Sequence, residues 1–458
     1  MTHTLGCKVN FADTQSVAEQ LLAGEVTCSG DDRAACQGNG GMECTNRGTG
    51  APVEIVGTCC VTAEGEKQSR KEVRRALRRV GPEGRVFVTG CAARLAPEVF
   101  EAMGENVEAV AGEPAEAAAA IAARLGMGWP APAVGEAALE HDSGAVDDGG
   151  FRSPEGGGKV DRRTRRTRFF LKVQEGCAGM CSYCVVPLVR GRPRSLPAAA
   201  LQAEAAARVS GGFLELVATG INVGAYRDGP VRLPGLLAAL AATPGLLRLR
   251  LSSIEATDVT PELVDVLAGN EVIGRHLHLP LQSGDDGVLA DMGRCYRRAD
   301  FAAAVARIRE ALPGVNLTTD VIVGYPAEDE AAFERTLEFV EEMGFSKAHV
   351  FTYSQRPGTR AAAQGDPVPP PEKKRRSLRL RRLSDRLGHA FRERKLGQVS
   401  EVLWESPLPS GGLGGYSSDY TRFTVPDAVT APVGRVLAEA VTGDGIKGRL
   451  VDGWQEEG

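Results

Sequence analysis

Three cysteines within eight residues are the feature of this sequence with the clearest chemistry. Cys177, Cys181 and Cys184 lie in the stretch EGCAGMCSYC (175–184), spaced as C-x3-C-x2-C. A tetrahedral zinc site or a closed iron–sulfur cluster takes four ligands, so three thiolates leave one position open. A cubane cluster with an open iron can chelate S-adenosylmethionine and deliver one electron into its sulfonium. The alternatives are a zinc site completed by a distant His or Cys, and three structural thiols.

The elements around these cysteines predict that they lie at one end of a parallel sheet. Six strand-like runs alternate with helical stretches such as 197–210, 300–312 and 328–343. Such alternation favours parallel strands joined by right-handed crossovers, hence a β/α barrel or an open α/β sheet. The cysteines directly follow the first run, at the face where barrels build active sites, and this position favours radical chemistry over zinc. The runs are FFLKVQ (169–174), FLELVA (213–218), LRLRLS (247–252), HLHLPL (276–281), NLTTDVIV (316–323) and AHVFT (348–352).

The bulk composition is that of an ordinary soluble protein. The chain has 458 residues, a net charge of −5 and eleven cysteines. No apolar run approaches the roughly 20 residues of a membrane span, and the N-terminus lacks the pattern of a signal peptide. We therefore expect a cytoplasmic protein with no membrane partner, whose cysteines serve metal binding or catalysis and not a disulfide framework.

Composition also divides the chain. The Gly-, Asp- and Ser-rich stretch 142–158 indicates a linker, and a second break lies at 365–374, where four prolines are expected to preclude a helix. From about residue 397, short strand-like pieces alternate with glycine-rich turns, which suits a small all-β module. The expected domains are 1–125, a linker at 126–162, the barrel at 163–392 and the β module at 393–458.

The residues that follow the barrel cysteines resemble the radical-SAM methylthiotransferases. That family continues with I-P-x-x-R-G-x-x-R-S, and here the run is VVPLVRGRPRS (185–195). The resemblance implies an α/β fold with an N-terminal methylthiotransferase domain, a radical-SAM partial (β/α)6 barrel and a small C-terminal β-barrel similar to the tRNA-gripping TRAM domain. It extends through VATGINVGAY (217–226), LRLSSIEA (249–256), HLHLPLQSG (276–284), TTDVIVGYPAEDEAAF (318–333) and HVFTYSQRPGTRAA (349–362).

The resemblance also implies a second 4Fe-4S cluster, on Cys7, Cys59 and Cys91. These cysteines match the family motifs as LGCKVN, GTCCVT and VTGCAAR. The residues alone favour three buried core cysteines, whereas the resemblance favours ligation. Two departures stand out: Cys60 directly follows Cys59 and could compete with it, and an insert at 26–52 carries Cys28, Cys36 and Cys44.

The stretch HTLGCKVN resembles the family branch that acts on N6-threonylcarbamoyladenosine, and SSIEA and HLHLPLQSG lean the same way. The implied reaction replaces the hydrogen on carbon 2 of that base, next to the anticodon of tRNA, by a methylthio group. One S-adenosyl-L-methionine supplies the methyl group and a second supplies the radical. The implied partners are a tRNA anticodon stem-loop, an external electron donor and a sulfur source. The enzyme itself is expected to be a monomer.

Other functions stay open. The family also contains enzymes for isopentenyladenosine tRNA and for a ribosomal protein, and a non-catalytic iron–sulfur tRNA-binding or electron-transfer protein or a zinc-stabilised RNA-binding protein would share some of these features. The basic runs at 159–168 and 373–386 could contact phosphate or form a solvated face. His276 and His278 alternate within a strand, where core or supporting packing is preferred to metal ligation.

Overall fold

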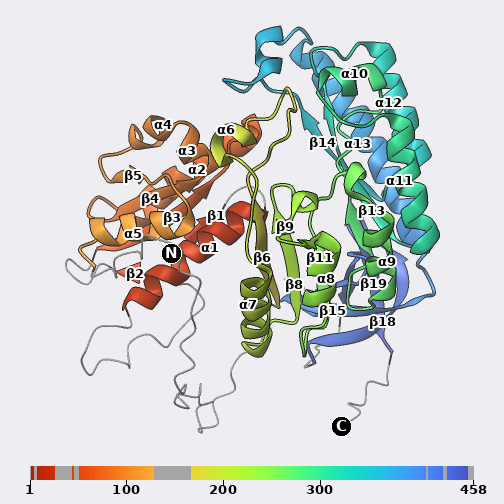
Figure 1. The fold of residues 1–458 in the computed structure, drawn as a ribbon, viewed down its shortest axis with the longest axis horizontal. Helices are drawn as coiled ribbons and strands as arrows, with labels where there is room; N and C mark the ends of the chain where they lie inside the picture. Colours follow the sequence, from red (N-terminus) through yellow and green to blue (C-terminus); the bar gives the residue numbers. More distant parts are fainter. Residues whose placement is uncertain are drawn as a thin grey trace.

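The computed structural model of the chain describes residues 2–4, 8–25, 44–45, 51–127, 167–408, 411–426 and 431–451. Cys7, Cys28, Cys36 and nearly all of the predicted linker lie outside these ranges. Figure 1 shows an N-terminal α/β unit beside strand β6 of a central β/α half-barrel, with the C-terminal strands gathered at one end of that half-barrel. None of the described helices combines the length and apolar composition that crossing a bilayer requires.

The N-terminal unit is a small, mostly parallel sheet in the order β1-β3-β4-β5, with β2 antiparallel on β3. Its central strand β3 is buried along almost its whole length, which explains its run of apolar residues. Helix α2 begins where the Thr62 hydroxyl accepts the amide of Gly65 at 2.9 Å. The elements are β1 Thr2–Thr4, α1 Lys8–Glu25, β2 Cys44–Thr45, β3 Pro52–Thr58, α2 Ala63–Val80, β4 Arg85–Gly90, α3 Cys91–Leu95, α4 Pro97–Glu101, β5 Val107–Ala109 and α5 Pro114–Arg124.

The central unit confirms the six predicted strands. They are β6 Arg168–Glu175, β8 Glu215–Gly220, β11 Arg248–Leu251, β12 His276–His278, β13 Asn316–Val323 and β14 Lys347–Thr352. Their pairings with one another are parallel, and isolated bridges between Leu249 and Ile273 and between Ser253 and His278 connect β11 to β12. The large core lies between these strands and the outer helices. Strand β12 is shorter than predicted, since the chain leaves regular pairing after His278.

The crossover helices are α7 Ala198–Ser210, α8 Leu233–Ala241, α9 Pro261–Gly269, α11 Arg298–Ala311 and α12 Glu330–Met343. Helix α13 Pro370–Glu393 follows the last strand, β14. Shorter elements complete the unit: α6 Val186–Arg190, β7 Arg194–Ser195, η2 Val223–Ala225, β9 Arg227–Asp228, β10 Val231–Arg232, η3 Ala256–Asp258, α10 Asp286–Asp291 and η4 Arg360–Gln364.

The prediction that the prolines at 365–374 preclude a helix is wrong. Helix α13 begins at Pro370, with prolines in its first turn. Proline is tolerated there because the first amides of a helix have no intrahelical acceptor. The basic run at 373–386 lies on this helix, and its arginines pair with acidic residues of α12: Arg379 reaches Glu334 at 2.6 Å and Arg386 reaches Glu341 at 2.6 Å. These contacts favour a packing role for the run over phosphate binding.

The C-terminal unit is a closed barrel in the order β15-β16-β17-β19-β18, which confirms the predicted small β-barrel. Trp404, Phe423 and Val436 lie in its core. Four of its strands match the strand-like pieces VSEVLWE, YTRFTV, RVLAEAV and GRLVD of the sequence, whereas β16 lies in a glycine-rich stretch. Gly415 is required there, since an added Cβ would lie 2.3 Å from the Leu403 carbonyl oxygen. The strands are β15 Val399–Pro407, β16 Leu413–Ser417, β17 Arg422–Val425, β18 Val433–Val441 and β19 Ile446–Leu450.

Candidate iron–sulfur centres

The three barrel cysteines lie on the loop between β6 and α6, at the C-terminal end of β6. Gly176, directly before Cys177, has φ +71°, and an added Cβ would lie 2.1 Å from the Arg192 carbonyl oxygen. Only glycine fits this position. The loop is held by backbone hydrogen bonds from Cys177 to Gly191 at 3.0 Å and from Ser182 to Met292 at 2.9 Å. The predicted ligands therefore share one short loop whose path is set by its neighbours.

N–H donors reach the sulfurs of this loop. The Gly179 amide donates to Cys177 Sγ at 3.1 Å, and Arg294 Nη1 donates to Cys181 Sγ at 3.3 Å. The Arg294 side chain is 6% exposed and also pairs with Glu255. Burial raises the pKa of Cys184 to about 12, so this thiol gives up its proton readily only when a cation takes its place. Three thiols with such donors fit an iron–sulfur cluster, whose sulfurs accept hydrogen bonds of this kind.

Tyr183 lies between the last two cysteines and packs beside a buried group that includes Met292, Tyr325 and Tyr353. Burial raises its pKa well above the ordinary value, so the phenol stays neutral. The Ser182 hydroxyl is hydrogen-bonded to the Tyr325 hydroxyl at 2.8 Å. The side chains of the loop thus anchor it to the barrel while the cysteines remain partly exposed.

The predicted N-terminal cysteines lie at one edge of the N-terminal sheet. Cys59 follows β3 and Cys91 follows β4, and the last residues of these strands, Thr58 and Gly90, are partners in the parallel ladder. All of the cysteines here are buried, with exposed fractions of 6% for Cys59, 1% for Cys60 and 2% for Cys91. The third predicted ligand, Cys7, lies outside the described residues.

Cys60 lies close enough to Cys91 to compete with Cys59 as a cluster ligand, as its position next to Cys59 in the sequence suggested. Its thiol is hydrogen-bonded to Cys91, and this contact, with Arg190 nearby, lowers the pKa of Cys91 to about 6. Cys59 Sγ instead lies toward the first turn of α2, where an added Cβ on Gly65 would approach it to 3.3 Å. The structure therefore brings Cys59, Cys60 and Cys91 together at one sheet edge, with Cys60 in direct contact with Cys91.

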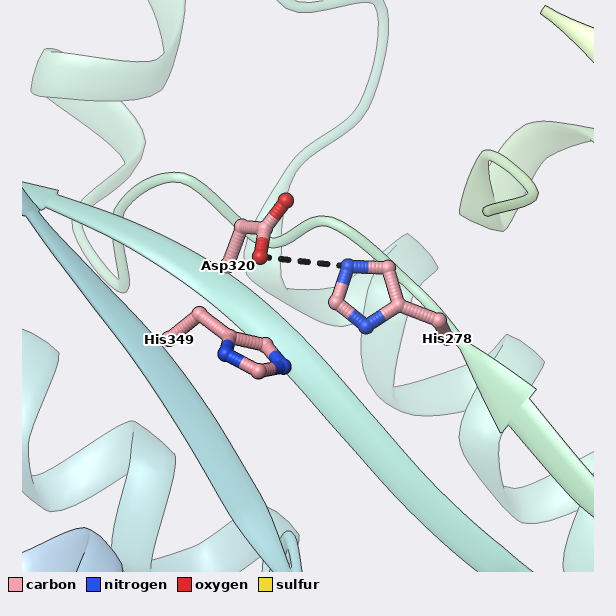
Figure 2. Close-up of side chains that lie close together, drawn as sticks. All are labelled: His278, Asp320 and His349. Atoms are coloured by element: carbon pink, nitrogen blue, oxygen red, sulfur yellow. Dashed lines mark ion pairs between the residues drawn. The ribbon is translucent and has the colours of Figure 1, made fainter. Parts of the chain in front are cut away.

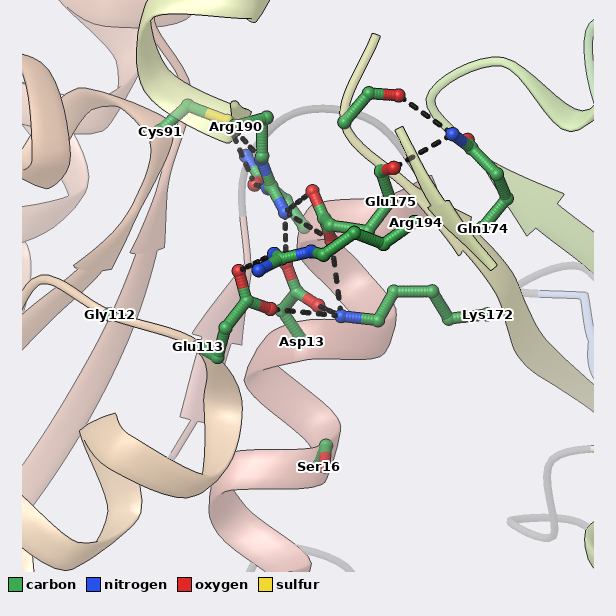
Figure 3. A network of polar contacts seen from close by, with 12 residues as sticks. Asp13, Ser16, Cys91, Gly112, Glu113, Lys172, Gln174, Glu175, Arg190 and Arg194 are labelled. Carbon is green, nitrogen blue, oxygen red and sulfur yellow. Dashed lines mark hydrogen bonds and ion pairs between the residues drawn. The ribbon is translucent and has the colours of Figure 1, made fainter. Parts of the chain in front are cut away.

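Arg190 links Cys91 to Glu175, which lies two residues before the first barrel cysteine (Figure 3). It ends α6, six residues after Cys184, and its guanidinium Nε donates to Cys91 Sγ at 3.1 Å. Nη1 reaches both carboxylate oxygens of Glu175 at 3.1 Å and also pairs with Asp13. Lys172 completes the network, with Nζ 2.6 Å from Asp13. A cation from the helix after the barrel cysteines thus faces a buried thiol of the N-terminal unit, as expected of a group that supports a thiolate ligand.

Two of these functional side chains carried no assigned role in the sequence. Arg190 stands in the R-G-x-x-R-S run, but its partner Cys91 is 99 residues away. Arg294 is 113 residues from Cys181 in a stretch without a motif. Only the three-dimensional arrangement identifies them.

Comparisons with known proteins extend over nearly the whole chain. Residues 171–340 match the radical SAM superfamily, and residues 1–112 match a family described as uncharacterized protein family UPF0004. A Thermotoga maritima protein named threonylcarbamoyladenosine tRNA methylthiotransferase is 34% identical over 424 residues, 92% of this chain and 89% of that protein. A Bacillus subtilis protein of the same name is 34% identical over 428 residues, 92% and 88% of the two chains. A Moorella thermoacetica protein named tRNA-2-methylthio-N(6)-dimethylallyladenosine synthase is 32% identical over 465 residues, 98% of each chain.

Proposed function

Because the chain belongs to the radical-SAM methylthiotransferase family, we propose that it methylthiolates carbon 2 of N6-threonylcarbamoyladenosine next to the anticodon of tRNA. The observation that carries the proposal is the loop of Cys177, Cys181 and Cys184, with N–H donors aimed at two of its sulfurs. The names of the Thermotoga and Bacillus relatives support the substrate. The stretch HTLGCKVN supports the same branch.

The barrel cysteines would hold a cluster that binds S-adenosylmethionine. When bound there, the cluster supplies the electron that cleaves this molecule. The Gly179 amide and the Arg294 guanidinium stabilise the thiolates, because each donates a hydrogen bond to a sulfur. Glu255 fixes Arg294 in turn, which keeps the cation at Cys181.

The second cluster would be held by Cys7, Cys59 and Cys91 and would serve sulfur insertion. The proximity of Cys59 and Cys91 at one sheet edge supports this assignment, as does the cation of Arg190 at Cys91 Sγ. Cys60 is the competing ligand, and its contact with Cys91 makes the choice between Cys59 and Cys60 a matter for experiment.

The C-terminal barrel would grip the tRNA in the manner of a TRAM domain, which its closed five-stranded architecture supports. A target base in a single-stranded anticodon loop can be turned into the barrel mouth at modest cost in stacking. The cytoplasmic location, the monomeric state, the external electron donor and the sulfur source stay predictions.

A second substrate has specific support. The Moorella relative is named for N6-dimethylallyladenosine, so tRNA that carries isopentenyladenosine is the alternative. We prefer threonylcarbamoyladenosine because of the stretch HTLGCKVN. Enzymes of the isopentenyladenosine branch typically have G-C-Q-M-N at this position.

The test uses the full chain with its clusters reconstituted under anaerobic conditions. It is supplied with tRNA of either modification, and the digested nucleosides are measured by mass spectrometry. We expect methylthio-threonylcarbamoyladenosine as the product. Product only from isopentenyladenosine tRNA would move the enzyme to the alternative branch, and no product from either tRNA would refute the proposal.

Iron content and cysteine variants separate the two sites. Two cubanes predict about eight irons per chain. Cys177→Ala should abolish reductive cleavage of S-adenosylmethionine, whereas Cys91→Ala should keep cleavage, lose the methylthio product and bind about four irons. Cys295→Ala is the matched control, because Cys295 is an exposed free cysteine in neither site. Comparison of Cys59→Ala with Cys60→Ala then identifies the ligand.

A further inference from the structure

Three side chains that can bind a metal ion, none of them a cysteine, meet on neighbouring strands of the half-barrel. Figure 2 shows His278 at the end of β12, Asp320 on β13 and His349 on β14. Asp320 and His349 are partners in the ladder, and His278 pairs with Thr318, two residues before Asp320. Since alternate residues of a strand point to the same face, this register places all three side chains on one face. One ligand atom from each lies within 4.8 Å of those of the other two.

Hydrogen bonds hold His278 in an orientation suited to ligation. Its Nδ1 is 2.9 Å from the Thr318 hydroxyl, which also lies 2.9 Å from Nε2 of the buried His276. His278 Nε2 therefore faces Asp320, at 3.2 Å from Oδ1. In a metal-binding histidine, one ring nitrogen is held by a hydrogen bond while the other binds the ion. His278 can offer Nε2 in this way, on the side where Asp320 lies.

An ion pair between His278 and Asp320 would explain the position of these two side chains, but not that of His349. Its ring centroid lies 5.6 Å from that of His278, and within the described ranges it has no hydrogen-bond partner. Burial lowers its pKa even though Asp320 lies beside it. The residue is nevertheless exposed, which gives an ion access from solvent.

We propose that His278, Asp320 and His349 form a binding site for a borderline divalent cation such as Zn²⁺ or Co²⁺. Two imidazoles and one carboxylate match the ligands that Zn²⁺ takes in catalytic sites, with a further position left for water or another oxygen ligand. The carboxylate of Asp320 faces both imidazoles, which favours a cation over an anion. His276 and Thr318 support the site from behind and do not bind the ion. The site does not depend on the proposed substrate.

The experiment measures zinc on the holoenzyme, so that the cluster cysteines are already occupied. The reconstituted full chain is freed of loosely bound metal with a chelator, titrated with Zn²⁺ by calorimetry, and then assayed for zinc by mass spectrometry. We expect one tight equivalent. X-ray absorption should give nitrogen and oxygen ligands at about 2.0–2.1 Å and no sulfur at about 2.3 Å.

His349→Gln and Asp320→Asn should each weaken zinc binding at least tenfold while the iron content stays unchanged. His349 is exposed, so its variant is expected to fold. His389→Gln is the matched control: His389 lies on α13, is 55% exposed and pairs only weakly with Glu393 at 3.5 Å. The proposal is overturned if the wild type binds no zinc beyond the His349→Gln variant, or if the bound zinc has sulfur ligands.

Discussion

At the scale of single residues, Arg190 shows how one buried cation joins two units of the chain. Its side chain is fully buried, and its donors reach Cys91, Glu175, Asp13 and Asn10. Three of these partners, Cys91, Asp13 and Asn10, belong to the N-terminal unit, while Glu175 ends β6 just before the barrel cysteines. The spacing of the cysteines is readable in sequence, but this contact is not.

Removal of Arg190 should destabilise the protein strongly. Arg190→Gln leaves Asp13 and Glu175 buried with only Lys172 between them, and an uncompensated buried charge costs about 3–5 kcal/mol. Chemical denaturation should therefore show an early loss of structure. Arg194→Gln is the control from the same motif: Arg194 is 59% exposed and pairs with Glu113 at 2.8 Å, so about 0–1 kcal/mol is expected. Adding Asp13→Asn to Arg190→Gln should restore part of the loss; equal effects of the two arginine variants would contradict this account.

At the scale of elements, what could be predicted depended on whether the signal was local. The six barrel strands were predictable because each is an apolar run between helical stretches. The position of Cys177 at the C-terminal end of β6 was predictable because it directly follows the first of these runs. Strand β16 was not, since close packing against β15 requires glycine where apolar alternation would have marked a strand. The meeting of His278 with His349 was hidden for another reason: it depends on the register of three strands.

Helix α13 offers a test of element packing. Gly388 faces the end of the barrel, where an added Cβ would lie 2.5 Å from the Ser346 carbonyl oxygen. Gly388→Ala should thus push α13 away from β14 and destabilise the chain by about 1–3 kcal/mol, as overpacking does. In Gly269→Ala, at the end of α9, an added Cβ meets nothing within 4 Å, so stability should stay equal or rise by up to about 1 kcal/mol. Thermal unfolding of both variants makes the comparison, and a harmless Gly388→Ala would show that α13 adjusts freely.

At the scale of the whole molecule, one carboxylate organises the junction between the half-barrel and the C-terminal barrel. Glu215 is fully buried at the start of β8 and pairs with Arg168, Arg248 and Arg250. These arginines reach the C-terminal unit: Arg248 donates to the Tyr416 carbonyl at 2.9 Å and Arg250 to the Ser417 carbonyl at 2.7 Å. The stability of the junction should therefore depend on the charge of Glu215.

Burial alone would raise the pKa of Glu215, but Arg250 and Arg168 hold it below its ordinary value of 4.5. A carboxylate whose pKa is lower in the folded than in the unfolded state contributes stability above the unfolded value and loses it as the pH falls through the folded one.

Glu215→Gln should cost about 3–5 kcal/mol near neutral pH, because three arginines then lack their anion. Below pH 4.5 the difference from wild type should shrink, since Glu215 binds a proton first in the unfolded wild type and, at lower pH, in the folded protein as well. Glu401→Gln is the matched control: Glu401 is 48% exposed and pairs with Arg248 at 3.4 Å, so its effect should be small at every pH. Unfolding midpoints of the three proteins are compared from pH 8 down to about pH 3, which includes the range where the difference should shrink. A Glu215→Gln variant as stable as Glu401→Gln at pH 7 would show that the arginines hold the junction without their carboxylate.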